Sequence, residues 1–140
     1  MKLAVIVVLI VAAASSHATW AWMRGSAVSE FQQQDWDMLN ATVDAALDDL
    51  ADGETATWFN ERTGNGGSVT PVKTFTIRQN RCRRARFKNE TRSGKVGQQV
   101  YHTCKVDEEW KLISASEVRL ELEKQRELDE NREMDELKTQ

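Results

Sequence analysis

The chain has 140 residues and a formal net charge of −3 at neutral pH, with 40% hydrophobic and 29% charged residues. This length allows one domain with a tail or a targeting segment, and the hydrophobic content excludes a fully disordered chain. Two cysteines are too few for a multiply bridged mini-protein or a four-cysteine zinc site. The composition therefore predicts one globular domain.

The first 18 residues have the features of a secretory signal peptide. Lys2 precedes an unbroken apolar run over residues 3–14, and small residues stand at Ser16 and Ala18. A helix over this run rises only about 18 Å, which is too short for a bilayer core of about 30 Å. We expect cleavage before Thr19 and an exported protein, periplasmic or associated with the cell surface or outer membrane. Because no cysteine lies near this site, we expect no lipid anchor; an uncleaved membrane anchor is the alternative.

Residues 29–52 are typical of an amphipathic helix. Ser29 has the character of an N-cap, with Gln32 three residues later as its capping-box partner. The aspartates of this segment, Asp35 among them, lie largely off its apolar face. Gly53 ends the helix. The apolar residues recur at spacings of three and four and are Trp36, Leu39, Val43, Ala46, Leu47 and Leu50.

Short β-type segments follow, joined by polar or glycine-rich turns over residues 61–67, 79–80, 89–94 and 106–109. Trp58 is a predicted core residue of the first strand, and Pro71 places an edge or a bulge at the start of the second. Successive strands with short links favour an antiparallel meander. Residues 19–113 are therefore predicted to form an α+β domain, with one helix packed on a curled antiparallel sheet of about five strands. The expected strands cover residues 55–60, 69–78 and 81–88, then a segment with Val96, Val100 and Cys104, and finally residues 110–113.

Cys82 and Cys104 are the only cysteines, and both follow the predicted cleavage site. An exported chain with an even number of cysteines most simply forms one structural disulfide. This bridge would close a loop of about 22 residues and stabilise the fold by about 3 kcal/mol. The alternative is a pair of free or metal-binding thiols, although the spacing is not that of a Cys-x-x-Cys redox motif.

The composition changes again over residues 114–140, which hold nine acidic and five basic residues and few large apolar groups. Its larger apolar residues keep no heptad register, and they are Val118, Leu122, Leu128, Met134 and Leu137. A solvated helix or a frayed tail is one interpretation. A helix that binds a partner, or a weak coiled coil, is the other.

Charge is strongly segregated along the chain. Residues 19–61 carry nine acidic residues and one basic residue, whereas residues 62–105 carry eleven basic residues and one acidic residue. The densest basic stretch supplies the candidate anion- or partner-binding residues, which are Arg78, Arg81, Arg83, Arg84, Arg86 and Lys88. In a regular strand Arg84 and Arg86 point to one sheet face and Arg83 points to the other.

Such a basic row suits an anionic envelope polymer or an acidic envelope protein, and the export signal disfavours nucleic acid. Two other interpretations stay open. The basic strand can be a solvated face, or the basic strands and the acidic helix can neutralise each other across the fold.

The sequence contains no recognisable catalytic constellation. His102 shares the strand parity of Cys104, which favours a partly buried histidine over a general base. The glycine-rich segment 64–67 lacks the Lys-Ser/Thr pair and the helix of a P-loop. The acidic residues near the end of the helix do not have calcium-loop spacing, and they are Asp48, Asp49 and Asp52. We therefore expect no catalytic residues, no metal and no cofactor.

A series of motifs over about residues 44–113 carries a family resemblance. Ala46-Leu47 at a helix end is followed by Trp58 and Asn60, by Thr63-Gly64, Gly67 and Val69-Thr70-Pro71, by Phe75, by Cys82-Arg83 and Phe87, and by Cys104-Lys105, Asp107 and Trp110. In this order the stretch resembles the C-terminal domain of the rickettsial-type 17 kDa surface antigen family of proteobacterial envelopes.

This sequence departs from the family pattern at several points. Many members carry a lipid-modified cysteine and a glycine-rich membrane segment before the domain, which this chain does not have. Lys105 replaces an arginine, and Glu108 stands where the family usually has glycine. The resemblance implies a non-enzymatic domain at the envelope or surface, with peripheral outer-membrane association.

Two functional hypotheses follow. In the first, the protein is a structural or interaction domain that presents a sheet face or its C-terminal helix to an envelope partner. In the second, it is a periplasmic binding module or inhibitor that engages an anionic polymer or acidic protein through the strand over residues 81–88. An enzyme would need a deep polar pocket around His102.

Overall fold

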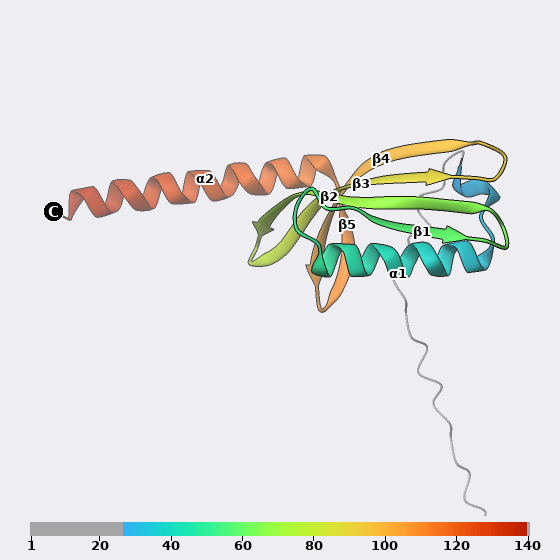
Figure 1. The fold of residues 1–140 in the computed structure, drawn as a ribbon. Coiled ribbons are helices and arrows are strands. Elements are labelled where there is room, and N and C mark those ends of the chain that lie inside the picture. Colours follow the sequence, from blue (N-terminus) through green and yellow to red (C-terminus); the bar gives the residue numbers. More distant parts are fainter. Residues whose placement is uncertain (1–26, 140) are drawn as a thin grey trace, which may run out of the picture.

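The computed structural model describes residues 27–139, so the predicted signal segment lies outside the described residues. A 3₁₀ turn η2 (Val28–Glu30) and helix α1 (Gln33–Asp49) precede an open five-stranded sheet. The strands pair antiparallel in chain order, which confirms the predicted α+β meander (Figure 1). They are β1 (Ala56–Asn60), β2 (Asn65–Ile77), β3 (Asn80–Glu90), β4 (Val96–Val106) and β5 (Glu109–Ile113), and helix α2 (Ala115–Lys138) follows them.

Helix α1 is shorter at both ends than the sequence predicts. Its N-cap is Gln32, which forms a capping box with Asp35, and Ser29 lies in the 3₁₀ turn, so the prediction of Ser29 as N-cap is wrong. The carboxylate of Asp35 is also bound by the sheet, and this fixes where the first turn begins. The helix ends at Asp49, where the guanidinium of Arg83 donates hydrogen bonds to carbonyls of its last turn.

One face of the sheet is packed under α1, and we call it the covered face. Its residues on the sheet side are Trp58, Val69, Ala85, Phe87 and Trp110, and α1 contributes Leu39, Val43, Ala46 and Leu47. The ring of Phe31 meets Trp58 edge-on, with 5.2 Å between centroids. This arrangement confirms Trp58 as a core residue and the predicted apolar face of α1.

The predicted glycine-rich turn over residues 61–67 is too long by three residues, because Asn65, Gly66 and Gly67 belong to β2. Gly67 stands between Trp58 and Asn89 in the sheet register. A Cβ atom on Gly67 would lie 2.6 Å from Asn89 Oδ1 and 2.8 Å from Trp58 Nε1. Glycine is required here by side chains that reach over it from both neighbouring strands.

The connections inside the sheet are short. Arg78 and Gln79 link β2 to β3, and Asp107 and Glu108 link β4 to β5, each pair with both φ angles positive as in a type I′ turn. The first of these turns lies one residue before the predicted position. The register of β2 shifts between Pro71 and Lys73, so the irregularity expected at the proline is present but lies inside β2 and not at its start.

A second apolar cluster lies on the opposite side of the sheet. Cys82 and Cys104 occupy directly paired positions on β3 and β4 and form the predicted disulfide. Ile77 and Val118 of α2 pack with them. Ser114 caps α2 by accepting a hydrogen bond from the Glu117 amide at 3.1 Å, and beyond its first turns α2 extends away from the sheet (Figure 1). Within residues 27–139, no helix has the length and hydrophobicity that a bilayer crossing needs.

Candidate functional site

The structure separates the six basic residues singled out by the sequence into two groups. Arg78, Arg81 and Arg83 are held by the fold. Arg78 forms an ion pair with Glu121 of α2. Arg81 donates a hydrogen bond to the carbonyl of Asp48 at 3.1 Å, and its guanidinium carbon lies 5.9 Å from the ring centre of Trp110.

Arg83 is buried beneath α1, with only 1% of its surface exposed. Its Nη1 donates to the carbonyls of Ala46 at 3.3 Å and Leu47 at 2.9 Å, and its Nη2 donates to the Asp52 carboxylate at 2.9 Å. A cation at this position binds carbonyls at the C-terminal end of a helix, where the helix dipole is negative. Arg83 therefore joins α1 to β3, and its burial keeps it from any anion in solution.

Arg84, Arg86 and Lys88 form the second group. They alternate along β3 with the buried residues Arg83, Ala85 and Phe87, so all three project from the face opposite α1. All three are exposed, and no carboxylate within residues 27–139 forms an ion pair with any of them. The three cations are therefore available to a partner.

Polar side chains from β2 and β4 flank this basic row. Directly paired residues of an antiparallel sheet share a face. The register therefore defines three rows across β2, β3 and β4, which we call the open face: Ser68–Lys88–Gln98, Thr70–Arg86–Val100 and Lys73–Arg84–His102. The sequence alone did not identify Lys73, Ser68, Thr70 or Gln98 as part of this face, because only the pairing of the strands places them beside Arg84, Arg86 and Lys88.

His102 lies in the row of Arg84, partly buried, with its ring 6.2 Å from that of Phe75. Burial, and next the charge of Arg84, lower the pKa of His102 from its ordinary value of 6.5. Beside it runs a groove of about 400 Å³, whose other wall is the first three turns of α2 with Val118 and Leu122. His102 is therefore neutral at pH 7 and adds no charge to the open face.

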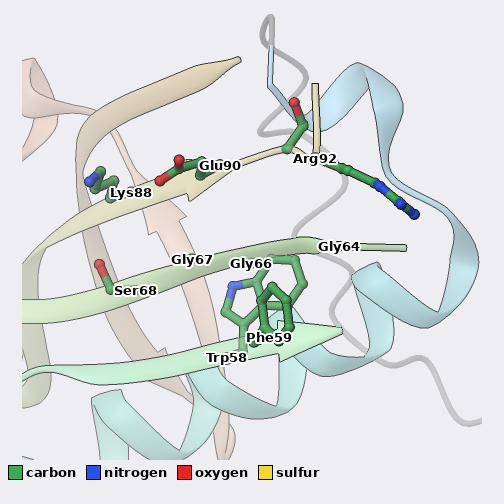
Figure 2. A pocket seen from close by; sticks show the side chains of 10 residues that line it. Trp58, Phe59, Gly64, Gly66, Gly67, Ser68, Lys88, Glu90 and Arg92 are labelled. Atoms are coloured by element: carbon green, nitrogen blue, oxygen red, sulfur yellow. The ribbon is translucent and has the colours of Figure 1, made fainter. Parts of the chain in front are cut away.

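A larger groove of about 710 Å³ lies where the open face meets the β1–β2 turn (Figure 2). Gly66 and Gly67 leave its floor without side chains, and Phe59 of β1, 60% exposed, stands beside them. Lys88 and Glu90 border it from β3, and Arg92 extends away from them (Figure 2). Phe59 follows the core residue Trp58, so strand alternation is the signal that would have placed it on this face.

Asp35 is a buried carboxylate that the sequence analysis wrongly placed off the packed face of the helix. Its oxygens accept hydrogen bonds from the side chains of Asn60 at 2.7 Å, Thr63 at 2.6 Å and Asn65 at 2.9 Å, and from the Gln32 amide at 2.8 Å. Burial raises the pKa of Asp35, but these hydrogen bonds outweigh burial and hold its pKa below the ordinary value. The cluster joins the start of α1 to the β1–β2 turn.

The acidic residues at the other end of α1 also bind protein groups. Asp48 accepts hydrogen bonds from Lys105 at 2.7 Å and from the Trp110 indole at 2.9 Å. Asp52 accepts from Arg83 and from both the amide and the hydroxyl of Thr74. In the part of the chain that the structure describes, no group of three His, Cys, Asp or Glu residues is placed to hold a metal ion.

Comparison with known proteins gives no relative for this chain: no family model, no curated protein and no solved structure matches it. The geometry of the open face is therefore the basis for a functional proposal.

Proposed function

We propose that the protein is a non-enzymatic, exported interaction domain of the surface-antigen type, which binds an acidic partner in the cell envelope through its open face. The observation that carries this proposal is the row of Arg84, Arg86 and Lys88, exposed and without ion-pair partners within residues 27–139. Basic side chains on a rigid central strand bind carboxylates or phosphates with little loss of backbone freedom.

The surroundings of the row support binding rather than a merely solvated face. Ser68, Thr70 and Gln98 add hydrogen-bonding groups on both sides of the cations. Two charged residues that serve the fold are placed differently, because Arg83 and Asp35 are buried and hydrogen-bonded to other parts of the domain. The disulfide is consistent with export, and the resemblance described above favours an envelope protein without catalytic activity.

The test measures binding of the purified protein to two probes, fluorescein-labelled polyglutamate and lipopolysaccharide, at about 50 and 300 mM NaCl. We expect anisotropy to rise with at least one probe, and the affinity to fall at the higher salt concentration because the contacts are ionic. Binding to polyglutamate alone would identify an acidic protein partner. Binding to lipopolysaccharide alone would identify an anionic polymer.

A matched pair of variants assigns the binding to the open face. The triple variant Arg84→Ala, Arg86→Ala, Lys88→Ala should lose at least about tenfold in affinity. The control Arg62→Ala, Lys124→Ala, Arg132→Ala removes the same charge from exposed positions elsewhere and should change affinity less than about twofold. Equal losses in both variants would mean that net charge alone drives binding, and the proposal would fail.

A further inference from the structure

Helix α2 extends into solvent far beyond its contacts with the domain (Figure 1). Its buried residue is Val118, and Glu121 is bound by Arg78. The helix has 24 residues and is therefore about 36 Å long. Isolated helices are marginally stable in water, and the ion pairs along α2 are exposed and weak. A long, mostly unsupported helix of this kind favours a role in contacting another molecule.

An acidic ridge runs along the side of α2 opposite Val118; its first residue, Glu123, also lines the groove beside His102. At about 100° per residue, Glu123, Glu127 and Glu130 lie about 120–180° around the helix from Val118. Two exposed apolar residues lie on this side, about 160° from Val118: Leu120 (63% exposed) and Met134 (51%); Leu137 (73%) lies at its edge, about 100° from Val118. The ridge therefore presents carboxylates in its middle, next to Lys124, with Leu120 before them and Met134, Leu137 and Lys138 after them.

The open face carries complementary groups in the same order. Arg84, Arg86 and Lys88 span about 13 Å along β3, and the three glutamates span about 11 Å along α2, a difference that flexible side chains easily bridge. The next row of the sheet beyond Lys88 is Phe59–Gly66–Glu90–Val96, in which the exposed apolar residues Phe59 and Val96 lie on either side of the exposed Glu90. Met134 and Leu137 follow Glu130 by about 6 and 11 Å, which brings them to this row.

We propose that α2 of one copy lies along the open face of a second copy, with the acidic ridge on the basic row and Met134 and Leu137 against Phe59 and Val96. The chain's own α2 cannot make this contact, because it leads away from its own sheet (Figure 1). A two-fold axis lets both copies make the contact at once, which gives a closed dimer. This inference rests on the proposed function, since it names the acidic partner of the open face.

The test is sedimentation velocity of the purified protein over a range of concentrations and salt. We expect a monomer–dimer equilibrium that shifts toward monomer as NaCl rises. Reversal of the ridge (Glu123→Arg, Glu127→Arg, Glu130→Arg) or of the row (Arg84→Glu, Arg86→Glu, Lys88→Glu) should each raise the dissociation constant at least tenfold. Circular dichroism checks that the helix and sheet persist in both.

Mixing the two reversed proteins gives the sharper result. Both contacts of the mixed dimer then pair opposite charges, so we expect a heterodimer although each reversed protein alone is monomeric. The matched control replaces Asp129, Glu133 and Glu136 by Arg. By the same helical geometry these three residues lie on the side of Val118. The control variant should therefore dimerise as the parent does.

The outcomes separate this inference from the proposed function. A parent protein that is monomeric at all concentrations, or a dimer that survives both reversals, overturns the inference. If such a monomer still binds polyglutamate or lipopolysaccharide through Arg84, Arg86 and Lys88, the proposed function stands with a different partner. If the protein is monomeric and also fails to bind polyglutamate and lipopolysaccharide, both the inference and the proposed function are overturned.

Discussion

The two faces of the sheet place charged side chains in different environments: buried and bound on one face, exposed and, among the described residues, unpaired on the other. On the covered face Arg83 and Asp35 are buried, and together they bind both ends of α1 to the sheet. On the open face Arg84 and Arg86 point into solvent, unpaired within residues 27–139. Adjacent arginines of one strand thus have different roles. This difference shows that the residues of a basic strand must first be assigned to one face of the sheet or the other, from their alternation, before a function is assigned to them.

The strongest test of this comparison is the Asp35→Ala variant, which removes the acceptor at the centre of the buried cluster. Asn60 and Asn65 would keep buried donors without this partner, and Thr63 a partly buried one, so we expect a loss of about 4 kcal/mol in the free energy of unfolding. Urea denaturation measures it. The control Asp37→Ala removes an exposed acid from the same helix turn and should cost less than about 0.5 kcal/mol. Similar losses in the two variants would contradict the assigned role of Asp35.

The disulfide links β3 and β4 at the end of the sheet covered by α2, beside the open face. Replacing both cysteines by serine should lower the free energy of unfolding by about 3 kcal/mol, because the unfolded chain gains freedom. Thermal melting of the variant, compared with the oxidised parent, measures the effect. Unchanged melting would mean that packing of Ile77 and Val118 alone holds this end together.

The neighbours Arg83 and Arg84 allow a direct comparison of the two faces. Arg83→Met removes the guanidinium donor from the last carbonyls of α1 and from the Asp52 carboxylate, and we expect a loss of about 2 kcal/mol in the free energy of unfolding. Arg84→Met removes an unpaired surface cation and should change stability by less than about 0.5 kcal/mol. Chemical denaturation measures the free energy of unfolding of both variants. A larger loss in Arg84→Met than in Arg83→Met would contradict the different roles assigned to the two faces.

The buried carboxylate also predicts a pH dependence. The pKa of Asp35 is lower in the folded protein than its ordinary value of 3.8, so its stabilising effect is complete above about pH 4. This part of the stability is lost as the pH falls through the lower folded pKa, where the carboxylate accepts a proton. Urea midpoints at pH 7 and pH 3 should therefore differ less in Asp35→Asn than in the parent. Equal differences would assign the acid sensitivity to other carboxylates.

Local pattern was sufficient for most of the fold. The strands, the meander and the apolar face of α1 follow from residue periodicity and turn composition, which act over a few neighbouring residues. The start of α1 was predicted wrongly because Ser29 and Gln32 have the same local capping character. Only the contact of Asp35 with Asn60 and Asn65, about 25 to 30 residues away, selects the later start.

The candidate site was predicted in part. Alternation along a strand separated Arg84 and Arg86 from Arg83, but no local signal indicated which of the two faces would be packed under α1. The sequence also did not show that Arg78 would be bound by Glu121 of α2, because that contact joins residues from two distant elements.

By itself, the sequence determined the class of fold, the disulfide partners and the stretch of chain that carries the basic residues. The tertiary structure alone decided which cations are buried, which are bound and which remain free, and it placed Ser68, Gln98 and Phe59 beside them. The physical reason is the range of the interactions. Propensity and periodicity act between near neighbours, whereas burial and charge pairing depend on which distant segments the fold brings together.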